Sequence, residues 1–193
     1  MNALNIIGVV YKEVEKTMKK KLISSLFTVM LLAGCAGIND SLTPSLSVTK
    51  DSFDGSTLLT QSPVSAASSL SEGWNTLGFD WNEKYPDVVF LEVGVNGITN
   101  VMGVAFNVDG EVIENIKAAS TLTKYGDWST RRLIMPISDF IKVAEGKDVK
   151  MKVYQIDTYT VSSFGPANDG AVVNTKFPPF ISMLKQQGVS IEN

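Results

Sequence analysis

Histidine is absent from this chain of 193 residues, and cysteine occurs once, at position 35. Without imidazole or a second thiol, the chain cannot build the zinc and copper sites that these groups form. The missing histidine also excludes Ser-His-Asp and Cys-His catalytic arrangements, and a lone cysteine permits no disulfide within the chain. Oxygen ligands for calcium or magnesium are present, but no Asp-x-Asx-x-Asx-Gly loop occurs. We therefore expect no metal and no cofactor, and a stability that comes from packing.

The first 35 residues are organised unlike the rest of the chain. Three lysines at positions 19–21 precede an apolar run from Leu22 to Leu31, which is followed by Leu32-Ala33-Gly34-Cys35. A basic segment, about ten apolar residues and then small residues make up the layout of a secretory signal. The last four residues resemble the lipobox of bacterial lipoproteins. This resemblance implies that the chain is cleaved before Cys35, which becomes the new N-terminus and carries a diacylglycerol thioether and a further acyl chain.

A transmembrane anchor is the alternative for the same segment. A spanning helix needs about 20 apolar residues, and the run from Leu22 to Ala33 is shorter. Because Ala36 rather than aspartate follows the cysteine, the resemblance to lipoproteins of Gram-negative cells implies the outer membrane, with the periplasmic and the surface-facing side both open. Acidic residues before Met18 do not suit a signal, so we expect Met18 to be the start and residues 1–17 to be an upstream extension.

Removal of residues 1–34 leaves 159 residues, enough for one domain with a sizeable core. The removed part carries five lysines and two glutamates, so the formal charge changes from −3 for the whole chain to −6 for the remainder. This acidic balance disfavours nucleic acid, which is bound largely through lysine and arginine. Residues 35–49 are rich in serine, threonine, asparagine and glycine, which predicts a flexible tether to the lipid. Residues 50–193 are expected to form a single domain.

Three successive apolar runs give the strongest fold signal. Residues 88–95 are almost continuously apolar, and apolar residues alternate with others along 98–108 and again along 112–118. The dipeptides Asn96-Gly97 and Asp109-Gly110 separate these runs. Such dipeptides favour type I′ hairpin turns, because both residues tolerate positive φ. The pattern predicts a three-strand antiparallel meander at the centre of the fold.

Two helices and several further strands are expected around this meander. Ser138 can cap a helix over residues 139–145, and Pro179 can begin a second helix that runs to about residue 187. About eight short strands with turn residues between them predict a mainly β fold, an antiparallel β-sandwich with two short helices. The further strands are expected at residues 57–61, 74–81, 132–137 and 149–161.

The same alternation predicts which apolar side chains form the core. Burying each of them contributes about 1.5–3 kcal/mol to stability. The predicted core residues are Val89, Leu91, Val93, Met102, Val104, Phe106, Leu133, Met135, Phe140, Val153 and Leu184.

The most loop-like polar cluster of the predicted domain lies around residues 125–132. Trp128 and Tyr125 could stack on sugar rings, as exposed aromatic residues do in many carbohydrate-binding β-sandwiches. Arg131 and Arg132 could together clamp a phosphate or a carboxylate. Ordinary packing and solvated strand ends are the alternatives for these residues. We take Trp128, Tyr125 and Arg132 as the candidate ligand-binding residues.

Two further tryptophans are constrained by their spacing. Trp74 and Trp81 lie seven residues apart in a predicted strand. Side chains alternate between the faces of a sheet, so these two point to opposite sides. At most one of them can meet a given ligand, and the other should be in the core.

Composition and motifs favour a non-catalytic, lipid-anchored envelope module that binds a partner protein or helps to assemble one. A carbohydrate- or peptidoglycan-binding sandwich that uses Trp128, Tyr125 and Arg132 is the alternative. A carboxylate-dependent hydrolase is the third hypothesis. It stays open because the distance between two carboxylates in space decides that mechanism, and the sequence does not give this distance. Its candidates lie close in sequence and resemble turn residues: Asp80 with Glu83, and Asp109 with Glu111.

The lipid anchor is tested by the substitution Cys35→Ser. We expect the variant to lose acylation and to appear as a soluble or an uncleaved form, because the thioether cannot be made. Membrane fractionation and mass spectrometry of the purified protein measure both effects. Unchanged membrane association together with an unchanged mass would exclude the anchor.

Overall fold

A computed structural model describes residues 43–114 and 116–191 of the chain. The predicted signal peptide, Cys35 and the predicted tether as far as residue 42 lie outside the described residues. The unit that begins at Pro44 is a mainly β fold with two antiparallel sheets and two α-helices, and the predicted β-sandwich is confirmed. Residues 47–49, at the end of the predicted tether, belong to its first strand.

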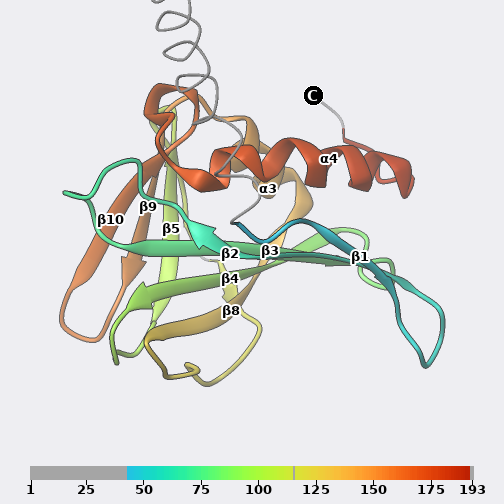
Figure 1. Cartoon of the computed structure of the whole chain (residues 1–193), viewed down its shortest axis with the longest axis horizontal. Helices are drawn as coiled ribbons and strands as arrows, with labels where there is room; N and C mark the ends of the chain where they lie inside the picture. The colour runs from blue at the N-terminus through green and yellow to red at the C-terminus, as the bar shows by residue number, and fades with distance from the viewer. Residues whose placement is uncertain (1–42, 115, 192–193) are drawn as a thin grey trace, which may run out of the picture. The chain divides into compact units, whose positions relative to one another are not determined.

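Two sheets form the layers of the sandwich (Figure 1). Neighbouring strands in each sheet are antiparallel. Sheet A contains, in spatial order, β1 (Ser47–Lys50), β2 (Thr57–Ser65), β3 (Asn75–Asn82), β4 (Val88–Asn96), β8 (Trp128–Pro136) and β7 (Lys117–Ala118). Sheet B contains β10 (Tyr159–Phe164), β9 (Val149–Tyr154), β5 (Gly103–Val108) and β6 (Glu111–Ile113).

The second of the two predicted hairpin turns is present. β5 and β6 pair through Asp109 and Gly110, whose φ angles of 53° and 98° are the positive values that a type I′ turn requires. The Asp109 carboxylate accepts hydrogen bonds from the backbone N–H groups of Lys147, at 3.1 Å, and Asp148, at 2.9 Å. These donors lower the pKa of Asp109 and tie the turn to the start of β9.

The prediction of a hairpin turn at Asn96-Gly97 is wrong, because the chain crosses from sheet A to sheet B after β4. Residues 97–102 make this connection, so the predicted meander is divided between the two sheets. Gly97 has a φ of 87°, as expected for a turn, but its N–H donates to the Asp127 carbonyl at 2.8 Å. Its own carbonyl accepts a hydrogen bond of 2.7 Å from Ser129 Oγ. Gly97 therefore joins a neighbouring segment of sheet A and does not close a hairpin.

The segment 149–161, predicted as one strand, contains a hairpin. β9 ends at Tyr154 and β10 begins at Tyr159, with a hydrogen bond of 2.9 Å from Gln155 N–H to the Thr158 carbonyl between them. The predicted strand 112–118 is divided as well, into β6 in sheet B and β7 in sheet A, while the strands predicted at 57–61, 74–81 and 132–137 are present with shifted ends. β2 extends to Ser65 through a change of register between Gln61 and Val64.

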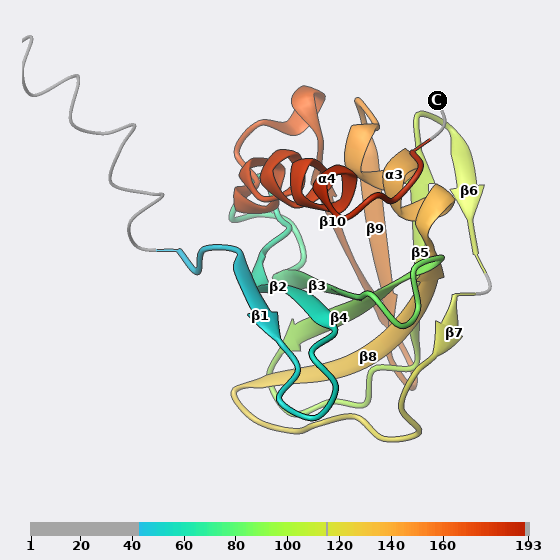
Figure 2. The same ribbon diagram turned by 90° about the vertical axis from the view of Figure 1, so that its right-hand side faces the viewer.

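Both predicted helices are present, as α3 (Ile137–Glu145) and α4 (Phe177–Gln186) (Figure 2). α3 begins directly after Pro136, so Ser138 lies inside the helix and is not its cap. Two short 3₁₀ helices, η1 (Pro166–Asn168) and η2 (Val172–Thr175), lead from β10 to α4. Among the described residues, none of the helices is both long enough and apolar enough to span a membrane.

The helices are joined to sheet A by an aromatic cluster around Phe79 on β3. Its ring centroid lies 5.3 Å from that of Phe140 on α3, and 5.2 and 4.7 Å from those of Phe177 and Phe180 on α4. All four rings are buried. The predicted core is confirmed at every position except Met102, which is half exposed because it lies in the crossing connection, where strand alternation does not hold.

The aromatic cluster can be tested with two phenylalanines of opposite exposure. We expect Phe79→Ala to lower the free energy of unfolding by about 3–5 kcal/mol, since it removes a buried ring and leaves a cavity. Phe53→Ala is the matched control, because Phe53 is 94% exposed and its loss should change stability by less than about 0.5 kcal/mol. Urea unfolding measures both values. Equal effects of the two substitutions would contradict the packing described here.

Candidate functional site

β8 sends successive side chains to opposite faces of sheet A. Arg131 points toward the segments that join the two sheets, where its guanidinium donates to backbone carbonyls. Arg132 lies on the outer face, where it meets Asp80 and Phe90. The two arginines are therefore separated by the sheet, and they cannot clamp one anion together.

Arg132 is held on the outer face by two contacts. Its Nη2 lies 2.9 Å from Asp80 Oδ2, and its guanidinium carbon lies 4.6 Å from the centre of the Phe90 ring. Asp80 is in the middle of β3 and not in a turn, which corrects the sequence-based assignment. Burial raises the pKa of Asp80, while the charge of Arg132 and a hydrogen bond from Thr60 oppose that rise. This arrangement is a partly buried ion pair.

The other candidate carboxylates also have structural partners. Glu83 follows β3 and accepts a hydrogen bond of 2.7 Å from the Thr57 N–H. Glu111 begins β6 and pairs with Lys142 on α3 at 3.0 Å. Asp109 fixes the β5–β6 turn, as described above. Within residues 43–114 and 116–191, moreover, no group of three or more acidic, histidine or cysteine residues is placed to hold a metal ion.

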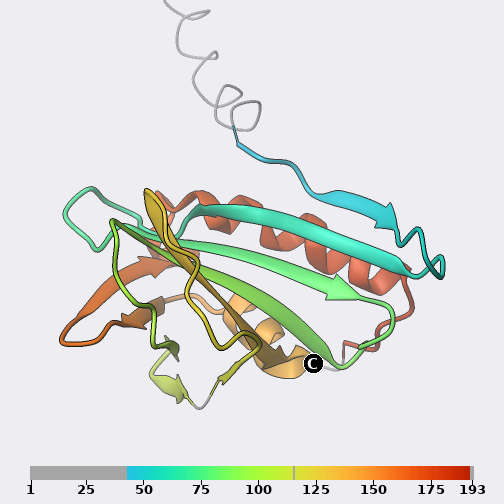
Figure 3. The same ribbon diagram turned by 90° about the horizontal axis from the view of Figure 1, so that it is seen from below.

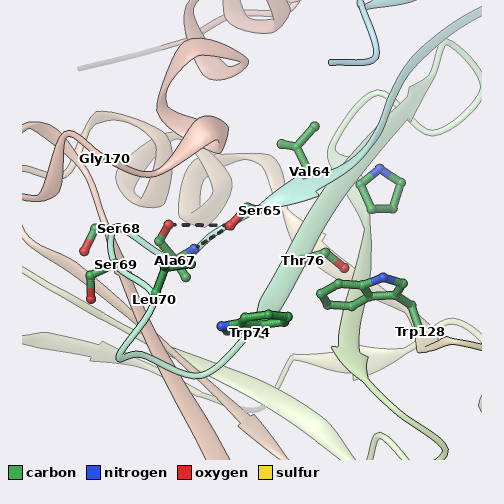
Figure 4. A pocket seen from close by; sticks show the side chains of 11 residues that line it. Val64, Ser65, Ala67, Ser68, Ser69, Leu70, Trp74, Thr76, Trp128 and Gly170 are labelled. Carbon is green, nitrogen blue, oxygen red and sulfur yellow. Dashed lines mark hydrogen bonds between the residues drawn. The ribbon is translucent and has the colours of Figure 1, made fainter. Parts of the chain in front are cut away.

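Trp128 contributes to a pocket on sheet A, but with a different partner from those predicted. The pocket has a volume of about 520 Å³ and lies between the loop that precedes β3, the end of β2 and the start of β8. Figure 4 shows the indoles of Trp74 and Trp128 along it, with Thr76 between them. Neither Tyr125 nor Arg132 lines this pocket. We call it the tryptophan pocket, lined by Pro63, Val64, Ser65, Ala67, Ser68, Ser69, Leu70, Trp74, Thr76, Trp128 and Gly170.

The spacing argument for the tryptophans is confirmed. Trp81 is 1% exposed and its indole N–H donates to the Pro86 carbonyl at 3.1 Å, so it is a core residue. Trp74 is half exposed and lies just before β3. The sequence showed that one of the two could meet a ligand, but it did not show that this residue lies beside Trp128.

The backbone around the tryptophan pocket is closely fitted. The register shift in β2 places Pro63 over Gly78 of β3, where an added Cβ would lie only 2.8 Å from the proline ring. The loop is fastened to β10, because the Glu72 carboxylate accepts from the N–H groups of Ser68 and Ser163 at 2.9 and 3.0 Å. Burial raises the pKa of Glu72, but these hydrogen bonds outweigh it and the pKa is lowered.

Tyr125 belongs to a second surface, which we call the loop tip. It consists of three connections: residues 97–102 between β4 and β5, residues 119–127 between β7 and β8, and residues 155–158 between β9 and β10. In Figures 1 and 2 they gather at the lower end of the sandwich, and Figure 3 looks onto that end.

Hydrogen bonds join the three connections of the loop tip to one another. Thr99 Oγ1 donates to Gln155 Oε1 at 3.0 Å, and Val101 N–H donates to Thr123 Oγ1 at 3.1 Å. Arg131 Nη1 donates to the Val101 and Met102 carbonyls at 2.9 and 3.0 Å, and its Nε reaches the Ser120 carbonyl. Arg131 therefore fixes the backbone of two of the connections, residues 97–102 and 119–127. Sequence reasoning treated this arginine as a ligand-binding or solvated group and missed that role.

Large apolar and aromatic side chains project from the loop tip into solvent. Ile98 is 84%, Leu122 78% and Ile156 67% exposed. Met102 is half exposed and Tyr125 is more than half exposed. Tyr159, at the start of β10, is also exposed and extends the surface. Charged residues in the three connections are few: Lys124, Asp127 and Asp157. Exposed apolar groups that form one continuous patch are typical of interaction surfaces.

The chain matches no protein-family model, and no curated protein and no solved structure is significantly similar to it. Function must therefore be argued from these surfaces alone.

The Asp80–Arg132 pair predicts how the stability of a variant should depend on pH. In Arg132→Leu the pKa of Asp80 should rise further, because the charge that opposes the effect of burial is gone. A carboxyl group with a raised folded-state pKa is destabilising when it is ionised, so the loss of stability should be largest at pH 7 and shrink as the pH falls toward 4. We expect a loss of about 1–3 kcal/mol at pH 7, between the values typical of surface and buried pairs.

Urea unfolding of the wild type and of Arg132→Leu at several pH values measures this loss. The double variant Asp80→Asn with Arg132→Leu is the control, and its loss should not depend on pH in this range. A loss in Arg132→Leu that is the same at pH 4 and pH 7 would mean that Asp80 and Arg132 are not coupled.

Proposed function

We propose that the protein is a lipid-anchored, non-catalytic module of the cell envelope that binds a partner protein through the loop tip. The observation that carries this proposal is the group of exposed apolar side chains on three connections that are hydrogen-bonded to one another. Buried interface centres are rich in apolar and aromatic groups and poor in charge. The loop tip has that composition before any partner is bound.

The fixed geometry of the loop tip supports a binding role. Side chains and loops that become ordered on binding reduce affinity, so a surface that is already ordered keeps more of its interaction energy. Arg131 and Thr123 hold the backbone of the connections, while Ile98, Leu122 and Ile156 are left free to contact a partner. The polar side chains thus maintain the shape, and the apolar ones provide the contact area.

The described unit begins on a different part of the sandwich from the loop tip. The described unit begins at Pro44, whose carbonyl accepts a hydrogen bond of 3.0 Å from the buried side chain of Gln61 on β2. In Figures 1 and 2 this beginning lies away from the loop tip. The nine residues from Cys35 to Thr43 can span at most about 30 Å. A lipid on Cys35 would therefore keep the domain near the outer membrane and leave the loop tip available to a neighbouring envelope protein.

The carboxylates support a non-catalytic role over the hydrolase hypothesis. Each of the four candidate carboxylates has an ion pair or a hydrogen bond that gives it a structural role. These residues are Asp80, Glu83, Asp109 and Glu111. None of them lines the tryptophan pocket. Glu111 lines another hollow together with Glu114 and Asp139, but its own partner there is Lys142 on α3.

A photo-reactive phenylalanine analogue placed at single positions in intact cells tests the proposal. We expect probes at Ile98, Leu122 and Ile156 to give a crosslinked product of the same defined mass, because the partner covers all three. Phe53 is the matched control, since it is fully exposed and lies in the β1–β2 loop, outside the loop tip. No product at the three positions, or the same product at Phe53, would contradict the proposal.

A further inference from the structure

The tryptophan pocket is electrically neutral. None of its eleven lining residues carries a charge. Its volume of about 520 Å³ falls within the range of about 300–1,000 Å³ that is usual for sites of small ligands. An anionic or cationic ligand would lose hydration there without gaining a counter-charge. The pocket therefore favours a ligand without charge.

Two indoles supply the broad apolar surfaces of the pocket. Trp74 and Trp128 are both partly exposed, so their rings are available on the side that faces the cavity (Figure 4). An indole combines a large apolar face with low conformational freedom, which makes it effective in contacts with flat ligands. A planar array of C–H groups can lie on such a face.

The hydroxyl of Thr76, between the indoles, is buried against the neighbouring strand. Thr76 Oγ1 is buried and makes no hydrogen bond with any group in the described residues. Gly94 on the neighbouring strand leaves space for this oxygen, because an added Cβ at Gly94 would collide with it. A buried polar atom without a partner costs about 1–3 kcal/mol. Thr76 Oγ1 carries that cost inside the sheet, because it lies against Gly94 and has almost no surface that a ligand could reach.

Serine hydroxyls add further polar atoms at the rim of the pocket. Ser65 Oγ accepts a hydrogen bond of 3.3 Å from the Ala67 N–H, and Ser69 Oγ lies 2.9 Å from Ser71 Oγ. Ser68 lines the pocket as well, and its backbone carbonyl is packed against Gly170. The pocket therefore combines two apolar ring faces with several hydroxyl groups and no charge.

We infer that the tryptophan pocket binds an uncharged sugar ring, with the C–H face of the ring on Trp128 or Trp74 and its hydroxyl groups at the serines of the rim. A sugar ring has both properties that the pocket demands, an apolar face and an edge of hydroxyl groups. An apolar peptide side chain has only the first property. This site adjoins the loop tip, because Trp128 forms a bridge with Gly97, but it shares no residue with it and the inference does not rest on the proposed protein partner.

Isothermal titration of the full-length protein in a sugar-free detergent tests the inference. The probes are three neutral oligosaccharides: triacetylchitotriose, cellotriose and maltotriose. We expect at least one of them to bind. Trp128→Ala and Trp74→Ala should each weaken that binding at least tenfold.

Tyr125→Ala is the matched control, because it removes an exposed aromatic ring outside the pocket and should leave sugar binding unchanged. Circular dichroism and urea unfolding of each variant establish that it is folded. The inference is overturned if none of the three sugars binds at 10 mM, or if Tyr125→Ala weakens binding as much as Trp128→Ala. It is also overturned if an apolar hexapeptide binds in a manner that depends on Trp128 while the sugars do not. None of these three results would affect the crosslinking test of the loop tip.

Discussion

The alternation of side chains along β8 is the constraint on which both surfaces depend. Pairing with β4 over nine residues fixes which side chains of β8 face outward and which face inward. Trp128 and Arg132 are thereby placed on the outer face, one in the tryptophan pocket and one in the ion pair with Asp80. Ser129 and Arg131 are placed on the inner side, where they bind the backbone of the loop tip. A shift of β8 by one residue would exchange these roles and disrupt both surfaces.

Much of the fold could be predicted from the sequence, because its dominant signals are local. Apolar alternation located the strands and nearly all of the core, and Asp109-Gly110 located one hairpin. The crossing after β4 could not be predicted in this way. Asn96-Gly97 has the chemistry of a hairpin turn, yet the hydrogen bonds that decide its path come from Asp127 and Ser129, some thirty residues later in the chain. Contacts of that range leave no trace in a local pattern, and Met102 was misplaced for the same reason.

The candidate site was predicted less well than the fold. Trp128, Tyr125 and Arg132 are neighbours in sequence, but they lie in the tryptophan pocket, the loop tip and the outer-face ion pair respectively. Strand spacing already separates Trp128 from Arg132 by about 13 Å, since four residues of strand rise about 3.3 Å each. The partner that Trp128 does have, Trp74, lies 54 positions away. It is brought near by the loop that Glu72 fastens to β10, a contact that no spacing rule reveals.

The position of β1 has a mechanical consequence. β1 is the first strand of the described unit, has four residues with exposed side chains, and pairs only with β2, from Ser47 opposite Thr60 to Lys50 opposite Thr57. A force that pulls on the chain before Pro44 therefore acts first on the Ser47 end of the β1–β2 pair. The backbone hydrogen bonds between these two strands then break one after another. Peeling uncovers Leu46, which packs against the core, but no side chain of β1 that is buried, and it frees about ten residues, roughly 30 Å of chain, before the load reaches β2. The sandwich, with its aromatic cluster and both surfaces, is thus protected from tension by a strand that can yield first and pair again when the force is removed.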